Sequence, residues 1–274
     1  MIEILKTILF GIVQGITEWL PISSTGHMIL LNEFVTLDVT PEFWEMFKVV
    51  IQFGSILAVV VVFFKKIFPF DFKGKTFIKK DIMLMWFKIV VGCIPGVLLI
   101  LLGLDEICEA MFQNYVTVAI MLILFGILFI LIENRNKKVQ AKITDISQVT
   151  FFMAFIIGVF QLIAAVFPGT SRSGATIVGA LLIGISRTVA AEFTFFLAIP
   201  TMLGASLLKL MKFGLSFTAW ELTILIVGMV VAFVVSVVVI RMLMDYVKKR
   251  DFKVFGWYRI VLGVVVLAYF MIFA

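Results

Sequence analysis

Charged residues are scarce in this sequence of 274 residues. Asp, Glu, Lys and Arg together make up 15% of it, whereas hydrophobic residues make up 63% and the mean hydropathy is +1.19. A soluble domain is about a quarter charged and about half apolar. The scarcity of charge therefore excludes an ordinary soluble domain, and the abundance of apolar residues excludes intrinsic disorder. The chain is predicted to be an all-α integral membrane protein.

Cysteine and histidine are also rare. The two cysteines, Cys93 and Cys108, form neither a disulfide framework nor a zinc-binding spacing, so they are predicted to be packing residues. The single histidine, His27, excludes the acid-phosphatase-like lipid phosphatases, which use two. A net charge of +6 does not indicate a nucleic-acid partner here, because the basic residues occur in short loops between apolar segments. We expect no nucleic-acid binding.

Six apolar segments are long enough to cross a bilayer, which takes about 20 residues. Two further segments are apolar but are interrupted by Pro, Gly and hydroxyl residues, which leaves helical pieces too short to cross alone. Irregular backbone inside a membrane is tolerated only where protein or a wet cavity satisfies it. Both are therefore predicted to be re-entrant helix hairpins. The predicted spans are 44–64, 85–104, 115–132, 188–210, 219–240 and 255–273, and the broken segments are 2–31 and 149–185.

The positions of the basic residues agree with this topology. Of the 23 lysines and arginines, sixteen fall on one side of the predicted membrane, whereas only Lys6, Lys209 and Lys212 fall on the other. The remaining four, Lys48, Lys88, Arg172 and Arg259, lie within or at the ends of apolar segments. Positive charge marks the cytoplasmic side. Both termini are therefore predicted to lie outside. The sixteen are Lys65, Lys66, Lys73, Lys75, Lys79, Lys80, Arg135, Lys137, Lys138, Lys142, Arg187, Arg241, Lys248, Lys249, Arg250 and Lys253.

The two broken segments resemble each other at an offset of 147 residues. Three predicted spans follow each of them, so the hairpins insert from opposite sides. This is the pattern of an inverted-topology repeat, which forms its site near the midplane from discontinuous helices. We predict one membrane domain, 1–274, with halves of about 1–140 and 141–274. The matched pairs are Gly11 and Gly158, Gln14 and Gln161, Ile16 and Ile163, Pro21 and Pro168, and Ser24 and Ser171.

Polar and ionisable residues concentrate at the two interruptions. Gln14 and Glu18 are four residues apart and so share a helix face. A carboxylate such as Glu18 within a membrane costs roughly 2.5–3.5 kcal/mol on the translocon scale, and such residues usually face a cavity. His27 closes the first interruption, and Arg172 lies in the second. At the offset of 147, Glu18 corresponds to Ala165, His27 to Gly174 and Arg172 to Thr25.

If the two interruptions meet, they form a charge-balanced site for a phosphorylated ligand. Arginine binds phosphate through a bidentate fork, and the N–H groups at a helix start also bind anions. Glu18 and His27 can act as general base or acid, and Ser24 is a nucleophile if either accepts its proton. The residues therefore predict an intramembrane site equipped for hydrolysis. Three nucleophiles remain open: Ser24, His27, or a water activated by Glu18.

Two long motifs resemble the signatures of a known family, the undecaprenyl-diphosphate phosphatases of the BacA/UppP type. Residues 11–27, Gly-Ile-Val-Gln-Gly-Ile-Thr-Glu-Trp-Leu-Pro-Ile-Ser-Ser-Thr-Gly-His, resemble the first signature: a Glu or Gln, three residues, a Glu, and then Pro-x-Ser-Ser-Thr-Gly-His. Residues 168–176 resemble the second, Pro-Gly-x-Ser-Arg-Ser-x-x-Thr, and residues 49–60 are also similar to the family. The resemblance extends over the whole chain in length and span order.

The resemblance implies hydrolysis of undecaprenyl diphosphate to undecaprenyl phosphate and inorganic phosphate. This recycles the lipid carrier of bacterial cell-wall synthesis, and raised levels confer bacitracin resistance. The resemblance further implies a multi-pass protein of the bacterial plasma membrane with its site open to the outer face, often a homodimer. Carried over by position, the catalytic residues are Glu18, Ser24, His27 and Arg172. The positions expected to bind the substrate phosphates are Gln14, Ser23, Thr25, Ser171, Ser173 and Thr176.

The resemblance also implies help from a divalent cation, Mg or Ca, whose ligands are unknown. Gln14 stands where some members of the family have Glu. Two carboxylates therefore cannot share a metal ion at this place, which weakens Gln14 as a metal ligand.

The main alternative function is a secondary transporter or flippase for a polyprenyl phosphate or another anion. Inverted repeats with helices broken at the midplane are typical of such transporters. Glu18 would then carry a coupling proton, and Arg172 would anchor the substrate. Release of phosphate by the purified protein in detergent, without any compartment, distinguishes an enzyme from a transporter.

Overall fold

The computed structural model describes residues 2–72, 77–137, 139–214 and 216–273. These residues form α-helices joined by short connections, and no β-strand occurs among them. The predicted all-α class is therefore confirmed. The elements are α1 (Ile2–Thr17), α2 (Ser24–Phe34), α3 (Pro41–Val50), α4 (Gln52–Val62), α5 (Phe64–Ile67), α6 (Lys80–Leu101), α7 (Leu104–Phe112), α8 (Tyr115–Asn136), η1 (Ile146–Gln148), α9 (Phe151–Val166), α10 (Arg172–Leu182), α11 (Arg187–Phe213), α12 (Ala219–Val247) and α13 (Lys253–Phe273).

Six stretches of helix are long and apolar enough to cross a membrane. Five are single helices, namely α6, α8, α11, α12 and α13, and the sixth combines α3 and α4 over Pro41–Val62. They coincide in order with the six segments predicted from the sequence. The prediction of six spans is therefore confirmed.

The two broken segments each form a pair of shorter helices, α1 with α2 and α9 with α10. Their lengths are 16 and 11 residues in both pairs. The two members of each pair pack against each other. These are the helix–turn–helix units that the sequence predicts, and their insertion into a bilayer from one side stays a prediction.

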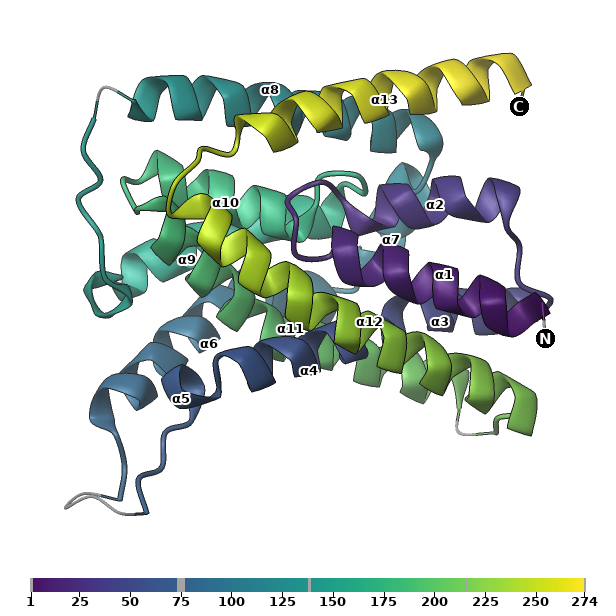
Figure 1. Cartoon of the computed structure of the whole chain (residues 1–274), viewed down its shortest axis with the longest axis horizontal. Helices are drawn as coiled ribbons and strands as arrows, with labels where there is room; N and C mark the ends of the chain where they lie inside the picture. The colour runs from purple at the N-terminus through teal and green to yellow at the C-terminus, as the bar shows by residue number, and fades with distance from the viewer. Residues whose placement is uncertain (1, 73–76, 138, 215, 274) are drawn as a thin grey trace.

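The two halves of the chain are interlocked. The first helix of each hairpin packs on the second span of the other half, α1 against α12 and α9 against α6. The third spans of the two halves, α8 and α13, run side by side (Figure 1). This reciprocal pairing is the packing that an inverted repeat predicts.

Glycine allows α8 and α13 to pack closely. A Cβ atom added to Gly126 would lie 2.7 Å from the carbonyl oxygen of Gly256, and one added to Gly256 would lie 2.8 Å from that of Gly126. Real Cβ atoms do not approach so closely, so a side chain at either position would push the helices apart. The contact brings the first turn of α13 close against α8.

The start of α1 and the end of α13 lie toward the same end of the helical bundle, as Figure 1 shows. The last residues of α5, α8 and α12 lie toward the opposite end. This separation agrees with the predicted grouping of most basic loops away from the termini. Lys73, Lys75 and Lys138 from those loops lie outside the described residues. Which end faces the cytoplasm stays a prediction.

Candidate active site

The turn of the first hairpin, residues 18–23, ends in a strained serine. Ser23 has φ +74° and ψ 95° although it is not glycine. Its Oγ accepts a hydrogen bond from the Gly26 backbone N–H at 3.3 Å, which caps α2. A conformation of this kind costs about 1–3 kcal/mol and tends to cluster at functional sites. The next residue, Ser24, begins α2, and its hydroxyl contacts Glu18.

The turn of the second hairpin, residues 167–171, also ends in a serine that has positive φ and caps the following helix. Ser171 has φ +66°, and its Oγ accepts a hydrogen bond from the Gly174 N–H at 3.1 Å, which caps α10. The backbone carbonyl of the same serine accepts from the Ala175 N–H at 2.8 Å. Both hairpin turns are therefore followed by a helix that begins in the same geometry.

The shared caps correct the alignment predicted from the sequence. The serine equivalent to Ser171 is Ser23, so the offset is 148 at the caps, although it is 147 at Pro21 and Pro168. The second turn holds one more residue between its proline and its cap. An alignment that uses one offset for the whole segment cannot include this extra residue. The pairs predicted as Ser24 with Ser171, Thr25 with Arg172, and His27 with Gly174 are therefore wrong by one residue.

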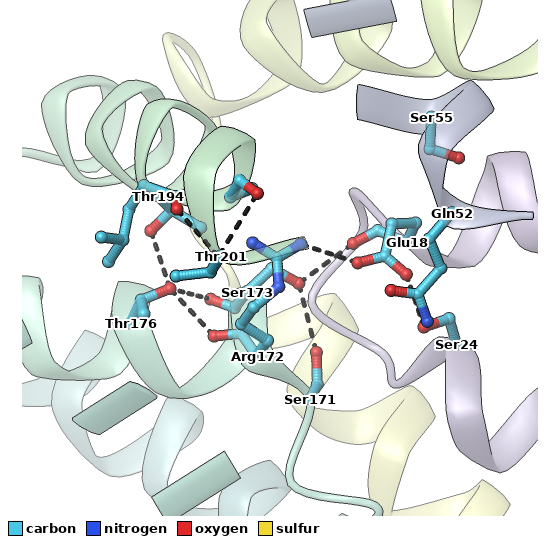
Figure 2. A network of polar contacts seen from close by, with 12 residues as sticks. Glu18, Ser24, Gln52, Ser55, Ser171, Arg172, Ser173, Thr176, Thr194 and Thr201 are labelled. Carbon is cyan, nitrogen blue, oxygen red and sulfur yellow. Dashed lines mark hydrogen bonds and ion pairs between the residues drawn. The ribbon is translucent and has the colours of Figure 1, made fainter. Parts of the chain in front are cut away.

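The corrected alignment places Ser24 and Arg172 at equivalent positions. Each is the first residue of its helix, α2 or α10. Because the two hairpins point toward each other, the two side chains approach the same space from opposite sides. Figure 2 shows Glu18 between them.

Glu18 joins the two turns. Its side chain is 6% exposed. One oxygen, Oε2, accepts hydrogen bonds from Ser24 Oγ at 2.7 Å and from Gln14 Nε2 at 2.9 Å. The other, Oε1, accepts from Arg172 Nη2 at 2.7 Å (Figure 2). The structure thus brings together Gln14, Glu18, Ser24 and Arg172, as the sequence predicts.

Two buried polar atoms at this place have no hydrogen-bond partner among the residues that the structure describes. They are Nη1 of Arg172 and Oε1 of Gln14. A buried polar atom left without a partner costs about 1–3 kcal/mol. Such an atom in a native structure calls for an explanation, of which a ligand is one. The Arg172 side chain is 18% exposed, so the guanidinium is not sealed from its surroundings.

The hydroxyl residues of the second motif mainly contact the protein itself. Ser173 Oγ donates to the backbone carbonyl of Glu18 at 3.3 Å, which is a second contact between the turns. Ser171 Oγ lies 3.2 Å from Ser173 Oγ. Thr176 Oγ1 donates to the Arg172 carbonyl at 2.9 Å and accepts from Thr194 at 2.9 Å (Figure 2). Ser173 and Thr176 therefore hold α10 and its turn in place.

His27 lies on α2, but its ring nitrogens have other partners. Nδ1 is 2.7 Å from the Ser23 carbonyl oxygen, and Nε2 is 2.7 Å from the Tyr258 hydroxyl. The two rings are parallel, with centroids 5.6 Å apart. Because a carbonyl oxygen only accepts, Nδ1 carries the proton, and a neutral His27 accepts from Tyr258 through Nε2. Thr25, next to it in the chain, is exposed.

Three residues near the site were not predicted from the sequence. The Gln52 side chain extends toward Glu18 and Ser24 in Figure 2. Tyr258 holds His27, and Arg259 contacts both turns through backbone carbonyls. The signal for Arg259 was an arginine inside an apolar segment, but only the packing of α13 on α8 places it at the site.

Comparison with known proteins identifies the family of this chain. The model of a protein family described as "Bacitracin resistance protein BacA" matches residues 7–265. That range contains both hairpin turns and all the residues around Glu18. The chain belongs to this family.

Curated relatives resemble the chain over nearly their whole length. A protein of Desulfitobacterium hafniense named undecaprenyl-diphosphatase is 63% identical over 270 residues, which is 98% of this chain and 97% of that protein. The undecaprenyl-diphosphatase 1 of Clostridium acetobutylicum is 63% identical over 271 residues, 99% and 98% of the two chains. An undecaprenyl-diphosphatase of Enterococcus faecalis is 61% identical over 268 residues, 97% and 96%.

Proposed function

We propose that the protein hydrolyses undecaprenyl diphosphate to undecaprenyl phosphate and inorganic phosphate. The names of its relatives in the BacA family support this activity. The observation that carries the proposal is a serine hydroxyl and an arginine guanidinium on the two oxygens of one buried carboxylate, each at 2.7 Å. These are a nucleophile, a base and an anion-binding group, supplied by both halves of the chain.

Binding of the diphosphate relies on Arg172 and on the helix starts. Nη1 of Arg172 is buried and has no hydrogen-bond partner in the described part of the chain, so a phosphate oxygen can accept from it. The first N–H groups of α2 and α10 have no acceptor within their helices and also favour an anion. Positioning and charge stabilisation are most of what phosphoryl transfer requires of a protein. The polyprenyl tail stays in the lipid.

In the proposed reaction, Ser24 attacks the terminal phosphorus. Its proton passes to Glu18 Oε2, which it already contacts at 2.7 Å. The anhydride P–O bond breaks, and undecaprenyl phosphate leaves with the proton that Glu18 returns to it. Glu18 then takes a proton from water, which attacks the phosphoserine; the bond between Ser24 Oγ and phosphorus breaks, inorganic phosphate leaves, and Glu18 returns the proton to the Ser24 oxygen. His27 fits the nucleophile role less well, because both of its ring nitrogens are hydrogen-bonded.

A divalent cation, Mg or Ca, is proposed to assist when the substrate is bound. Among the described residues, no group of three or more His, Cys, Asp or Glu side chains can hold a metal ion. The oxygen donors present, Gln14 Oε1 without a partner and the Glu18 carboxylate beside it, fit a hard cation that shares its remaining ligands with a diphosphate. Such an ion would neutralise part of the phosphate charge.

The bacterial plasma membrane is the proposed location, with both termini and the active site on the extracytoplasmic side and both hairpins re-entrant. The distribution of lysine and arginine supports this orientation. A cysteine introduced near residue 2 should react with an impermeant thiol reagent in intact cells, whereas a cysteine introduced at Lys249 should react only after the membrane has been opened. A homodimer is proposed from the family resemblance, and its mass in detergent tests it.

A phosphate-release assay tests the activity. The purified protein in detergent should release phosphate from a polyprenyl diphosphate, and chelator should lower the rate. The variant Ser24→Ala should be inactive, and labelled phosphate should be trapped on Ser24 of the normal chain after rapid quenching. Absence of release from the normal chain would favour a transporter, and release without a labelled serine would favour direct attack by water.

A further inference from the structure

Arg259 is an arginine buried completely inside the helical bundle. It lies on α13, its exposure is 0%, and the described residues include no carboxylate paired with it. Its guanidinium donates instead to backbone carbonyl oxygens. The shortest bonds run from Nη2 to Thr170 at 2.7 Å and to Gly169 at 3.0 Å, and from Nη1 to Pro21 at 3.1 Å. Longer ones reach Met121 and Leu122 of α8, at 3.4 and 3.5 Å.

These acceptors belong to both hairpin turns. Pro21 lies in the first turn, three residues after Glu18, and Thr170 lies in the second, two residues before Arg172. The guanidinium is planar and its donors have a fixed geometry. One rigid group therefore holds the two turns at a set distance from each other and from α8.

The surrounding chain makes room for this side chain. A Cβ atom on Gly174 would lie 2.9 Å from Arg259 Nη1 and 3.2 Å from Ser171 Cβ. Gly169 has φ +88°, and a Cβ there would lie 2.4 Å from the Val118 carbonyl oxygen. The second turn is thus shaped to present its carbonyl groups to the guanidinium.

Burial of the Arg259 side chain inside the membrane-spanning bundle costs free energy. An ionisable residue inside a membrane protein is rare and usually functional. Burying a positive charge costs free energy unless it is paired or hydrogen-bonded. No carboxylate pairs with Arg259 among the described residues, so its hydrogen bonds to backbone carbonyls are what offset this cost. Those contacts are concentrated on the two turns that carry the proposed catalytic residues.

We propose that Arg259 is a positioning residue that sets the distance between the two hairpin turns, and thereby the geometry of Ser24, Glu18 and Arg172. The proposal rests on the proposed phosphatase function. Arg259 contacts none of these three side chains directly, so it acts through the backbone. A displacement of about 1 Å at reacting groups can cost about 100-fold in rate.

The test compares Arg259→Lys and Arg259→Met in the purified protein. Lysine keeps the charge but loses the fork, so both variants should lose about 100-fold in kcat, whereas KM should change much less. Hydrogen exchange, measured without substrate, should increase together in peptides covering 18–27 and 168–176. Exchange in α4, α6 and α11 should remain as in the normal chain.

Two further variants control for general damage. Arg187→Lys makes the same exchange at a half-buried arginine whose Nη2 contacts the buried Glu133 at 2.6 Å, and it should keep normal kcat. Gly174→Ala retains Arg259 but adds a methyl group beside Nη1, and it should lower kcat with faster exchange in both turns. These variants keep the proposal testable if Arg259→Met does not fold.

Two outcomes would overturn the proposal. One is a normal kcat and normal exchange in Arg259→Lys together with loss in Arg259→Met, since charge alone would then explain the role. The other is increased exchange throughout the protein, which indicates a general structural role. If the normal chain released no phosphate, the proposed function would fail, but the exchange data would still decide whether Arg259 holds the two turns.

Discussion

The two hairpin turns have the same backbone design but carry different chemistry. In each, a serine with positive φ caps the following helix and is bonded by the N–H of a glycine three residues later. The first residue of the helix, however, is Ser24 in one half and Arg172 in the other. A duplicated scaffold thus presents a proposed nucleophile and a proposed phosphate ligand from opposite directions to one carboxylate.

The segments that precede the two turns also match in structure but differ in the polar residues that they carry. α1 carries Gln14 and is followed directly by Glu18, whereas the matched positions on α9 are Gln161 and Ala165. Gln161 is buried, and its Oε1 has no partner. The second half therefore retains the amide without the carboxylate. The comparison indicates that Glu18 is the one carboxylate that contacts the site residues of both halves. The following substitutions can test this asymmetry.

The largest effect is expected from removal of the carboxylate charge. Glu18→Gln keeps the size of the side chain but removes the proposed base, and it should lower the rate of phosphate release about 1,000-fold, within the range for general-base catalysis. Gln161→Leu, at the position matched to Gln14 in the second hairpin, is the control and should retain nearly normal release. Similar losses in the two variants would contradict the proposed asymmetry.

The next effect concerns the arginine of the second turn. Arg172→Lys preserves the charge but replaces the planar fork with a single nitrogen, so it has no second nitrogen for a phosphate oxygen while the first contacts Glu18. Removal of one preorganised donor typically costs about 100-fold or more in kcat. Steady-state kinetics with a polyprenyl diphosphate should show this loss. A lysine variant with normal kcat would mean that charge alone is sufficient there.

A smaller effect is expected from the contact that holds His27. Tyr258→Phe removes the hydroxyl 2.7 Å from His27 Nε2 but leaves the stacked ring. One hydrogen bond contributes about 0.5–1.5 kcal/mol, so kcat should fall roughly threefold to tenfold. A loss as large as that of Glu18→Gln would assign His27 a direct chemical role. The pH dependence of kcat in both variants makes the distinction.

Much of this site could be predicted from the sequence because membrane segments make polar residues conspicuous. Glu18 and Arg172 stand out against apolar neighbours, and the structure brings them to 2.7 Å. The one-residue insertion in the second turn could not be predicted, since it shows only in the φ angle of its capping serine. The partner of His27 is 231 residues away in the chain, and the packing of α13 alone determines that contact.

The smallest effect should come from the feature that the two turns share. Ser23→Ala and Ser171→Ala each remove a cap, which typically costs about 1 kcal/mol. Because the caps have the same geometry, the two variants should lower the thermal unfolding midpoint in detergent by similar amounts. Their activities should differ, since the first cap precedes the proposed nucleophile and the second precedes its phosphate ligand. Unequal stability losses would show that the two turns, despite matching φ angles, are supported differently by the surrounding helices.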